Sequence, residues 1–146
     1  MAEGETTRLQ LELVAPRGLV YEGEVDMVVV ATATGEMGIL PHHAALVAQL
    51  AIGQLRALTP AGTWLTFAVA DGFIKVQFNK VIVLADTAEE ASAIDVERAQ
   101  HGVQRALQRL EMHRTGTVPE DDVVDPYREQ LALRRARNRL KIAQMA

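Results

Sequence analysis

The hydrophobic pattern of this 146-residue chain changes its period once, near residue 90. Before that point apolar residues alternate with polar ones, as Leu9, Leu11 and Leu13 do, which is typical of a half-buried strand. After about residue 92 they recur at steps of three to five, which places one apolar stripe on a helix. The pattern therefore predicts an α+β fold. An N-terminal antiparallel β-sandwich over residues 1–88 is followed by a C-terminal antiparallel two-helix hairpin over residues 89–146.

Several short strands separated by turn residues account for the first segment. The run VDMVVVATA is apolar and β-branched, as a strand buried on both faces is. In GFIKVQF the alternation predicts that Ile74, Val76 and Phe78 share the core face. Turns are predicted at Pro16-Arg17-Gly18, Thr34-Gly35, Pro60-Ala61-Gly62, Asp71-Gly72 and Asn79-Lys80. Because no long helical segment interrupts these strands, a sandwich or barrel is favoured over a βαβ fold.

Two helices joined by the loop TGTVPEDDVVD are predicted for the second segment. Ser92 and Asp95, three residues apart, fit a capping-box start for a first helix that ends near Met112. Asp125 and Pro126 fit the N-cap and first position of the second helix. The predicted stripes are Ile94, Ala99, Val103, Ala106, Leu107 and Leu110, then Leu133, Ala136, Leu140 and Ala143. Alanine buries little area, and burial stabilises by roughly 25 cal/mol per Å², so the hairpin is expected to be held weakly, as a switch requires.

Charge is divided unevenly along the chain. Residues 125–146 contain six basic and two acidic side chains, a formal charge of +4 in a chain whose total is −4. This asymmetry predicts that the last helix meets an anionic partner or ligand. The start of the chain lacks the features of a secretion signal, and the apolar runs are about half as long as a membrane span, so a soluble or peripheral protein is expected.

Sequence motifs for catalysis are missing. The chain has no cysteine, no GxxxxGK[ST] loop, no GxSxG and no HExxH. The adjacent histidines His42 and His43 point in different directions, and no carboxylate lies at ligand spacing from them on a regular element, so no metal site is expected. The chain is therefore predicted not to be an enzyme by itself.

Three segments, TGEMGILPHHAALVAQL, VADGFIKVQFNKVIVLADTAE and AIDVERA, resemble the epsilon subunits of bacterial rotary F-type ATP synthases. The first carries the family's pattern of acidic residue, glycine, apolar pair, proline and histidine, here Glu36, Gly38, Ile39, Leu40, Pro41 and His43. With the order sandwich then hairpin, the resemblance spans nearly the whole chain. The chain departs from the family at His42 and Ala45, where glycine and proline are usual, and in a longer inter-helix loop.

The resemblance implies that the chain is a non-catalytic part of the central rotor stalk. Its role would be to couple proton flow to ATP synthesis mechanically. The sandwich would bind the gamma subunit and the ring of c subunits. The hairpin would fold beside the sandwich or extend toward the alpha/beta catalytic head, where the extended form inhibits ATP hydrolysis. The protein would lie on the cytoplasmic face of the bacterial inner membrane and touch the membrane only through the complex.

The resemblance also implies a regulatory ATP site, with no cofactor required. Asp95 and Arg98 match one half of the family's nucleotide-binding motif, Arg135 and Arg139 match the other half, and Glu89 matches a position near it. Arginine suits this role because its planar fork donates two bonds to phosphate. The alternative is that Asp95 caps a helix and Arg98 is solvated. Two stripes of arginine side chains favour the ligand-binding interpretation, because facing like charges would need an anion between them. The stripes are Arg98, Arg105 and Arg109 on the first helix and Arg128, Arg135 and Arg139 on the second.

Partner-binding residues are predicted in two places. Glu36 and His43 lie on an expected loop, where they would contact the c-ring or gamma. Arg128, Arg134 and Arg137 belong to the basic second helix, which would approach an acidic surface of the catalytic head.

Two other functions compete with a rotor subunit. A nucleic-acid-binding module is suggested by the basic last helix and a small β-domain that would be a barrel. Against it, the β-segment is acidic and aromatic residues make up only 4% of the chain, so stacking platforms are scarce and no nucleic-acid partner is expected. A small enzyme with a cryptic pocket lacks a nucleophile with its base and orienting group.

Overall fold

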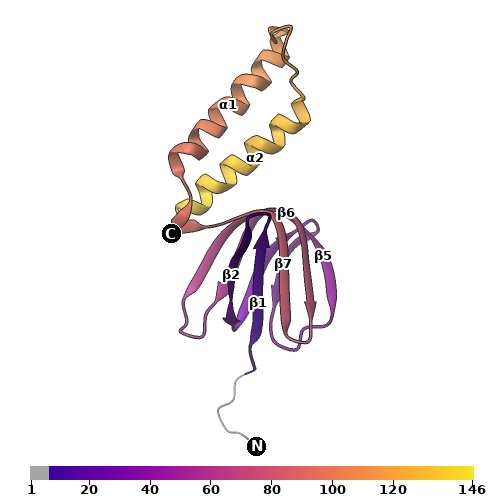
Figure 1. Cartoon of the computed structure of the whole chain (residues 1–146), viewed down its shortest axis with the longest axis vertical. Coiled ribbons are helices and arrows are strands. Elements are labelled where there is room, and N and C mark those ends of the chain that lie inside the picture. Colours follow the sequence, from indigo (N-terminus) through magenta and orange to yellow (C-terminus); the bar gives the residue numbers. More distant parts are fainter. Residues whose placement is uncertain (1–6) are drawn as a thin grey trace, which may run out of the picture.

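The computed structural model describes residues 7–146 (Figure 1). The first seven elements are strands, in which buried and exposed residues tend to alternate. The strands join in one sheet with the order β2-β1-β7-β6-β5-β3-β4, and the sheet curls into a sandwich. Their bounds are β1 Leu9–Ala15, β2 Gly18–Val25, β3 Met27–Thr32, β4 Gly35–Ile39, β5 Leu46–Leu58, β6 Trp64–Gln77 and β7 Lys80–Glu90. All neighbours are antiparallel except β1 and β7, which pair in parallel. The predicted α+β sandwich is thus confirmed, with one parallel pair that the alternation does not reveal.

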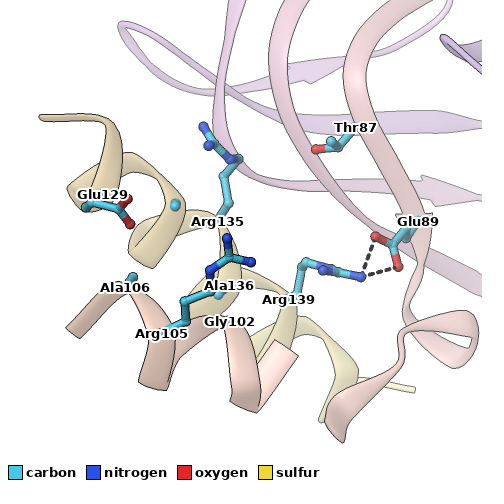
Figure 2. Close-up of a pocket in the computed structure, with 10 residues that line it drawn as sticks. Thr87, Glu89, Gly102, Arg105, Ala106, Glu129, Arg135, Ala136 and Arg139 are labelled. Carbon is cyan, nitrogen blue, oxygen red and sulfur yellow. Dashed lines mark hydrogen bonds and ion pairs between the residues drawn. The ribbon is translucent and has the colours of Figure 1, made fainter. Parts of the chain in front are cut away.

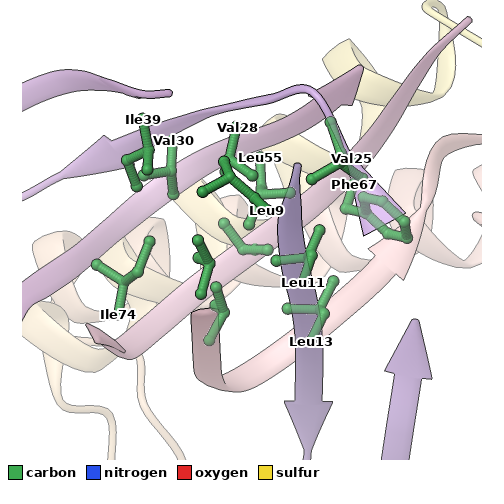
Figure 3. Packing of buried hydrophobic residues seen from close by; sticks show 14 of the residues in the cluster. Leu9, Leu11, Leu13, Val25, Val28, Val30, Ile39, Leu55, Phe67 and Ile74 are labelled. Carbon is green, nitrogen blue, oxygen red and sulfur yellow. The ribbon is translucent and has the colours of Figure 1, made fainter. Parts of the chain in front are cut away.

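The core of the sandwich comes from the inward positions of nearly every strand. Leu9, Leu11 and Leu13 of β1 are fully buried, as the alternation predicts, and they belong to the same cluster as Leu55 and Phe67 (Figure 3). Fully burying a leucine or phenylalanine side chain stabilises the fold by about 1.5–3 kcal/mol. This cluster makes the sandwich a rigid body on which the hairpin is mounted.

The predicted turn at Asp71-Gly72 is wrong, because both residues lie inside the 14-residue strand β6. Asp71 has φ 58° and Gly72 has φ 106°, so the strand kinks there, but pairing with β7 resumes at Gly72 opposite Ala85. The kink brings the backbone of β7 so close that a Cβ on Gly72 would lie 1.9 Å from the carbonyl oxygen of Leu84. Glycine is therefore needed here for space as well as for conformation.

The prediction that the side chain of Phe78 lies on the core face is also wrong. Its side chain is 91% exposed, because Phe78 and Asn79 form the two-residue turn between β6 and β7. Both have positive φ, 51° and 59°, as the tight turns favoured in β-hairpins require. Ile74 and Val76 are buried, so the alternation holds up to the turn and fails at its first residue.

A short 3-10 helix, Ala91–Ala93, links β7 to α1, Val96–Thr115. Asp95 is the N-cap of α1 and its carboxylate accepts a 3.0 Å hydrogen bond from the backbone N–H of Arg98. The predicted capping box is wrong, because Ser92 lies in the 3-10 helix. The first helix, predicted to end near Met112, continues three residues further to Thr115, where Gly116, with φ 69°, provides a left-handed cap.

The second helix, α2, spans Pro126–Ala143, with Asp125 as N-cap and Pro126 in its first turn, as predicted. The helices pack antiparallel through small residues, and a Cβ on Gly102 would lie only 3.3 Å from that of Ala136. Leu107, predicted for this seam, is 44% exposed. Within residues 7–146, neither helix has the length and apolar character needed to cross a membrane.

The hairpin meets the sandwich near the C-terminal end of α2 (Figure 1). Ile142 is 1% exposed and packs with Ala68, Ala91 and Ile94 in a cluster separate from the main core. The side-chain amide of Asn138 donates a 2.9 Å hydrogen bond to the carbonyl oxygen of Gly53 on β5. Two ion pairs, from Arg135 to Asp71 and from Arg139 to Glu89, also join α2 to the sandwich, and the weak attachment stays a prediction.

We predict that Gly72→Ala destabilises the protein by more than about 2 kcal/mol, since it adds a backbone clash to an unfavourable positive φ. Gly62→Ala is the matched control, because Gly62 also has positive φ, +84°, but nothing lies within 4 Å of its Cβ position. Its cost should be about 1–2 kcal/mol. Urea unfolding monitored by circular dichroism would measure both, and equal losses would show that the contact with Leu84 is unimportant.

Candidate functional site

A cleft of about 350 Å³ lies where the hairpin meets the last strand (Figure 2). Three elements form its walls: β7, α1 and α2. The lining residues are Thr87, Glu89, Gly102, Arg105, Ala106, Glu129, Ala132, Arg135, Ala136 and Arg139. Small residues on the facing helices leave the space, and three guanidinium groups surround it, so the cleft suits a ligand with several negative charges.

Glu89 of β7 and Arg139 of α2 form the best-defined contact in the cleft (Figure 2). The Nη2 atom of Arg139 lies 2.8 Å from Oε1 and 3.0 Å from Oε2 of Glu89, whereas its Nε is buried without a hydrogen-bond partner. Arg135 is held more loosely, with Nη1 3.8 Å from Oδ2 of Asp71. Arg105 makes no ion pair within residues 7–146. The guanidinium groups thus have unused donors.

The structure brings together three of the five residues predicted for nucleotide binding. Glu89, Arg135 and Arg139 line the cleft, whereas Asp95 and Arg98 do not. The carboxylate of Asp95 caps α1 by accepting a hydrogen bond from the backbone N–H of Arg98.

Sequence reasoning did not assign Glu129 or Thr87 to the site, and it named Arg105 only as part of an arginine stripe beside the ligand. Arg105 carries a visible signal, because it follows Arg98 by seven residues and so lies on a similar face of the helix. Nothing in the sequence marks Glu129 or Thr87, since their places in the cleft depend on how α2 and β7 pack.

The two predicted arginine stripes meet only in part: Arg105 lines the cleft with Arg135 and Arg139, whereas Arg109 is paired with acidic residues. Arg109 of α1 donates from Nε to Glu129 at 2.7 Å and from Nη1 to Asp122 at 2.9 Å, and its Nη2 donates to the carbonyl oxygen of Val123 at 3.1 Å. These bonds raise the pKa of Arg109, and the hydrogen bond from Arg109 is the main cause that lowers the pKa of Asp122. Arg128 is exposed outside the cleft.

Glu36 and His43 lie apart from this cleft. Glu36 belongs to strand β4, not to the predicted loop, and lines a second hollow of about 230 Å³ with Asn138 and Lys141 of α2. His43 lies in the loop after β4, where its Nδ1 is 2.8 Å from the carbonyl oxygen of Ala44. In the same loop the backbone N–H of His42 donates to Oδ1 of Asn79 at 2.6 Å.

Arg134 and Arg137 are exposed, like Arg128, and none of the three lines the cleft. Arg134 and Arg137, three residues apart, lie on a similar side of α2, whereas Arg128 lies elsewhere around the helix. Within residues 7–146 no group of three or more histidine and acidic side chains is placed to hold a metal ion.

The protein belongs to the class of α+β proteins in which a β-sandwich carries a C-terminal helix hairpin, here with an arginine-lined cleft where the two meet. Residues 8–91 match the ATP synthase delta/epsilon chain β-sandwich domain, and residues 92–144 match the long α-helix domain of the same chain. Among similar proteins, the ATP synthase epsilon chain of Desulforamulus reducens is 43% identical over 92% of this chain and 96% of its own. That of Halalkalibacterium halodurans is 45% identical over the same shares. The chain therefore belongs to the family of ATP synthase epsilon chains.

Solved structures share the fold at low identity. A chain of the Euglena gracilis mitochondrial ATP synthase has a TM-score of 0.75 and 22% identity, and the alignment covers 99% of this chain and 86% of that one. A chain from the Tetrahymena thermophila mitochondrial ATP synthase has a TM-score of 0.53 and 12% identity, with 97% of each chain covered. These likenesses support the arrangement of sandwich and hairpin.

Asp95 allows a direct test of its role as a cap. Asp95→Ala should lower the free energy of unfolding by about 1 kcal/mol, whereas Asp95→Ser, which keeps a capping oxygen, should stay within about 0.5 kcal/mol of the wild type. Far-UV circular dichroism during urea unfolding follows the helical signal. Equal stability of the alanine and serine variants would contradict the capping role and favour one in ligand binding.

Proposed function

We propose that this chain is a non-catalytic central-stalk subunit of an F-type ATP synthase, whose hairpin restrains ATP hydrolysis and responds to ATP. Its sandwich would bind the gamma subunit and the c-ring, and the hairpin would reach the alpha/beta catalytic head when extended. The chain would couple proton flow to ATP synthesis mechanically. It would lie on the cytoplasmic face of the bacterial inner membrane, held there by the complex, which is in keeping with its bacterial relatives.

The cleft between β7, α1 and α2 is the observation that carries the regulatory part of this proposal. Three guanidinium groups converge at the joint on which the hairpin would move. A triphosphate bound there bridges the helices to the sandwich and stabilises the compact form only. At 100 times its dissociation constant such a ligand contributes about 2.7 kcal/mol, which is enough to shift a weakly held arm.

The proposed gamma surface is the outer face of the sandwich. Phe73 and Leu84 are 56% and 55% exposed and lie directly opposite each other on β6 and β7. Val47, 68% exposed, lies on the neighbouring strand β5. Large apolar side chains gathered on one face are typical of a surface that a partner covers.

The proposed c-ring surface lies at the end of the sandwich away from the hairpin. The register of β6 and β7 runs from Phe67 opposite Glu90, beside the hairpin, to Gln77 opposite Lys80 at the far end. There the exposed Phe78 and the loop with Leu40 and His43 protrude together, since His42 is hydrogen-bonded to Asn79.

The exposed arginines of α2, Arg128, Arg134 and Arg137, are proposed to meet the acidic surface of the catalytic head when the hairpin extends. These side chains are exposed in the compact form and contribute little to its packing. A nucleic-acid-binding function is not favoured, because the family match covers both segments of the chain.

Calorimetric titration of the isolated protein with ATP should show binding at millimolar or tighter affinity. Arg135→Gln and Arg139→Gln should each weaken it about tenfold or more, because a hydrogen bond to a charged group contributes about 1.5–3 kcal/mol. Arg128→Gln is the matched control, since it removes the same charge from the same helix outside the cleft. Absence of heat from the wild type at millimolar ATP would exclude the ATP site.

Deletion of residues 125–146 should raise ATP hydrolysis by the assembled enzyme, because it removes α2 and its exposed arginines. The sandwich should still assemble, so gamma should co-purify with the truncated chain in the same amount as with the full chain. Unchanged hydrolysis with normal co-purification would show that the hairpin does not restrain this enzyme, whereas loss of gamma would contradict the proposed division of roles.

A further inference from the structure

Glu129 is an acidic side chain in a cleft that otherwise suits an anion. It lines the cleft from α2, and Arg105 and Arg135 line the same cleft (Figure 2). Its carboxylate is instead bound by Arg109, whose Nε lies 2.7 Å from Oε1 and which does not itself line the cleft. The side chains of Glu129 and Arg109 are only 18% and 24% exposed, so water screens this pair less than a surface pair.

Arg105 is the next cation that Glu129 would meet. Arg105 and Arg109 are four residues apart on α1 and therefore lie on one face, with Cβ atoms about 5–6 Å apart. Arg105 makes no ion pair within residues 7–146, so nothing there competes for it. If Arg109 released Glu129, the carboxylate would move toward Arg105 and cancel part of the positive charge of the cleft.

The inter-helix loop fixes Arg109 in its position. Asp122 accepts from Nη1 at 2.9 Å and from Nη2 at 3.4 Å, and the carbonyl oxygen of Val123 accepts from Nη2 at 3.1 Å. These contacts hold the guanidinium from the side opposite to Glu129. The long loop, which the sequence alone leaves without a role, thus supports the arginine that controls this carboxylate.

We propose that Arg109 is a positioning residue for the cleft: by binding Glu129 it keeps this carboxylate away from Arg105 and Arg135 and leaves their guanidinium groups available to an anionic ligand. This inference rests on the proposed nucleotide site. The inference adds that Arg109, which does not line the cleft and contacts the inter-helix loop, sets the net charge of the cleft.

The test combines NMR signals of the arginine Nε–Hε groups with calorimetric titration, using ATP and then inorganic tripolyphosphate as probes. In full-length Arg109→Gln, the Nε signals of Arg105 or Arg135 should shift as Glu129 binds them, and affinity for both probes should fall about tenfold. The double variant Arg109→Gln/Glu129→Gln should regain an affinity within about threefold of the wild type, because the quenching carboxylate is gone.

Glu111→Gln is the control for a merely structural effect. Glu111 pairs with Arg114 on the same helix and does not line the cleft, so its loss removes an acidic partner of an arginine while affinity should stay within about threefold. Unshifted signals of Arg105 and Arg135 in Arg109→Gln, or no recovery in the double variant, would overturn the inference. Shifted signals in a protein whose wild type binds neither probe would support the positioning by Arg109 and overturn the nucleotide site.

Discussion

The arrangement of the molecule depends on one shallow apolar contact, in which Ile142 near the end of α2 is buried with Ala68, Ala91 and Ile94. Alanine offers little area to bury, so this contact stabilises far less than the leucine and phenylalanine core of the sandwich does. Because the cleft takes its walls from β7, α1 and α2, it exists only while α2 stays in place. A weak joint and a ligand site that depends on it are the two parts that a ligand-responsive arm requires.

The features of the fold that could be predicted from the sequence are those with a local cause, such as alternating hydrophobicity or a helix cap. Alternation placed Leu9, Leu11 and Leu13 in the core, and Asp125 with Pro126 marked the start of α2. Other features depend on contacts that sequence spacing does not contain. Whether a strand turns or only kinks at Asp71-Gly72 is decided by the pairing of β6 with β7 on both sides of it. The α+β class was therefore accessible, whereas the parallel pairing of β1 with β7 was not.

The candidate site was predictable in part for the same reason. Arg135 and Arg139 are four residues apart on one helix, so their shared face follows from helical geometry. Similar spacing placed Arg98 with Arg105 and Arg109, but the three differ in the structure. Only Arg105 lines the cleft, and Arg109 is occupied by Asp122 and Glu129. The sequence shows the positive charges of a helix face, but the acidic groups that satisfy them come from a loop and a second helix.

The pair of Glu89 and Arg139 raises the question of how a phosphate would enter a cleft that already contains an ion pair. The two side chains remain 33% and 24% exposed, and partly exposed pairs contribute only about 0.2–1 kcal/mol. Exchanging the carboxylate for a phosphate would therefore cost little. The pair thus holds Arg139 in the cleft but binds it too weakly to exclude a ligand. The same pair links α2 to the sandwich, so a ligand that takes over Arg139 must itself bridge these elements to keep the hairpin compact.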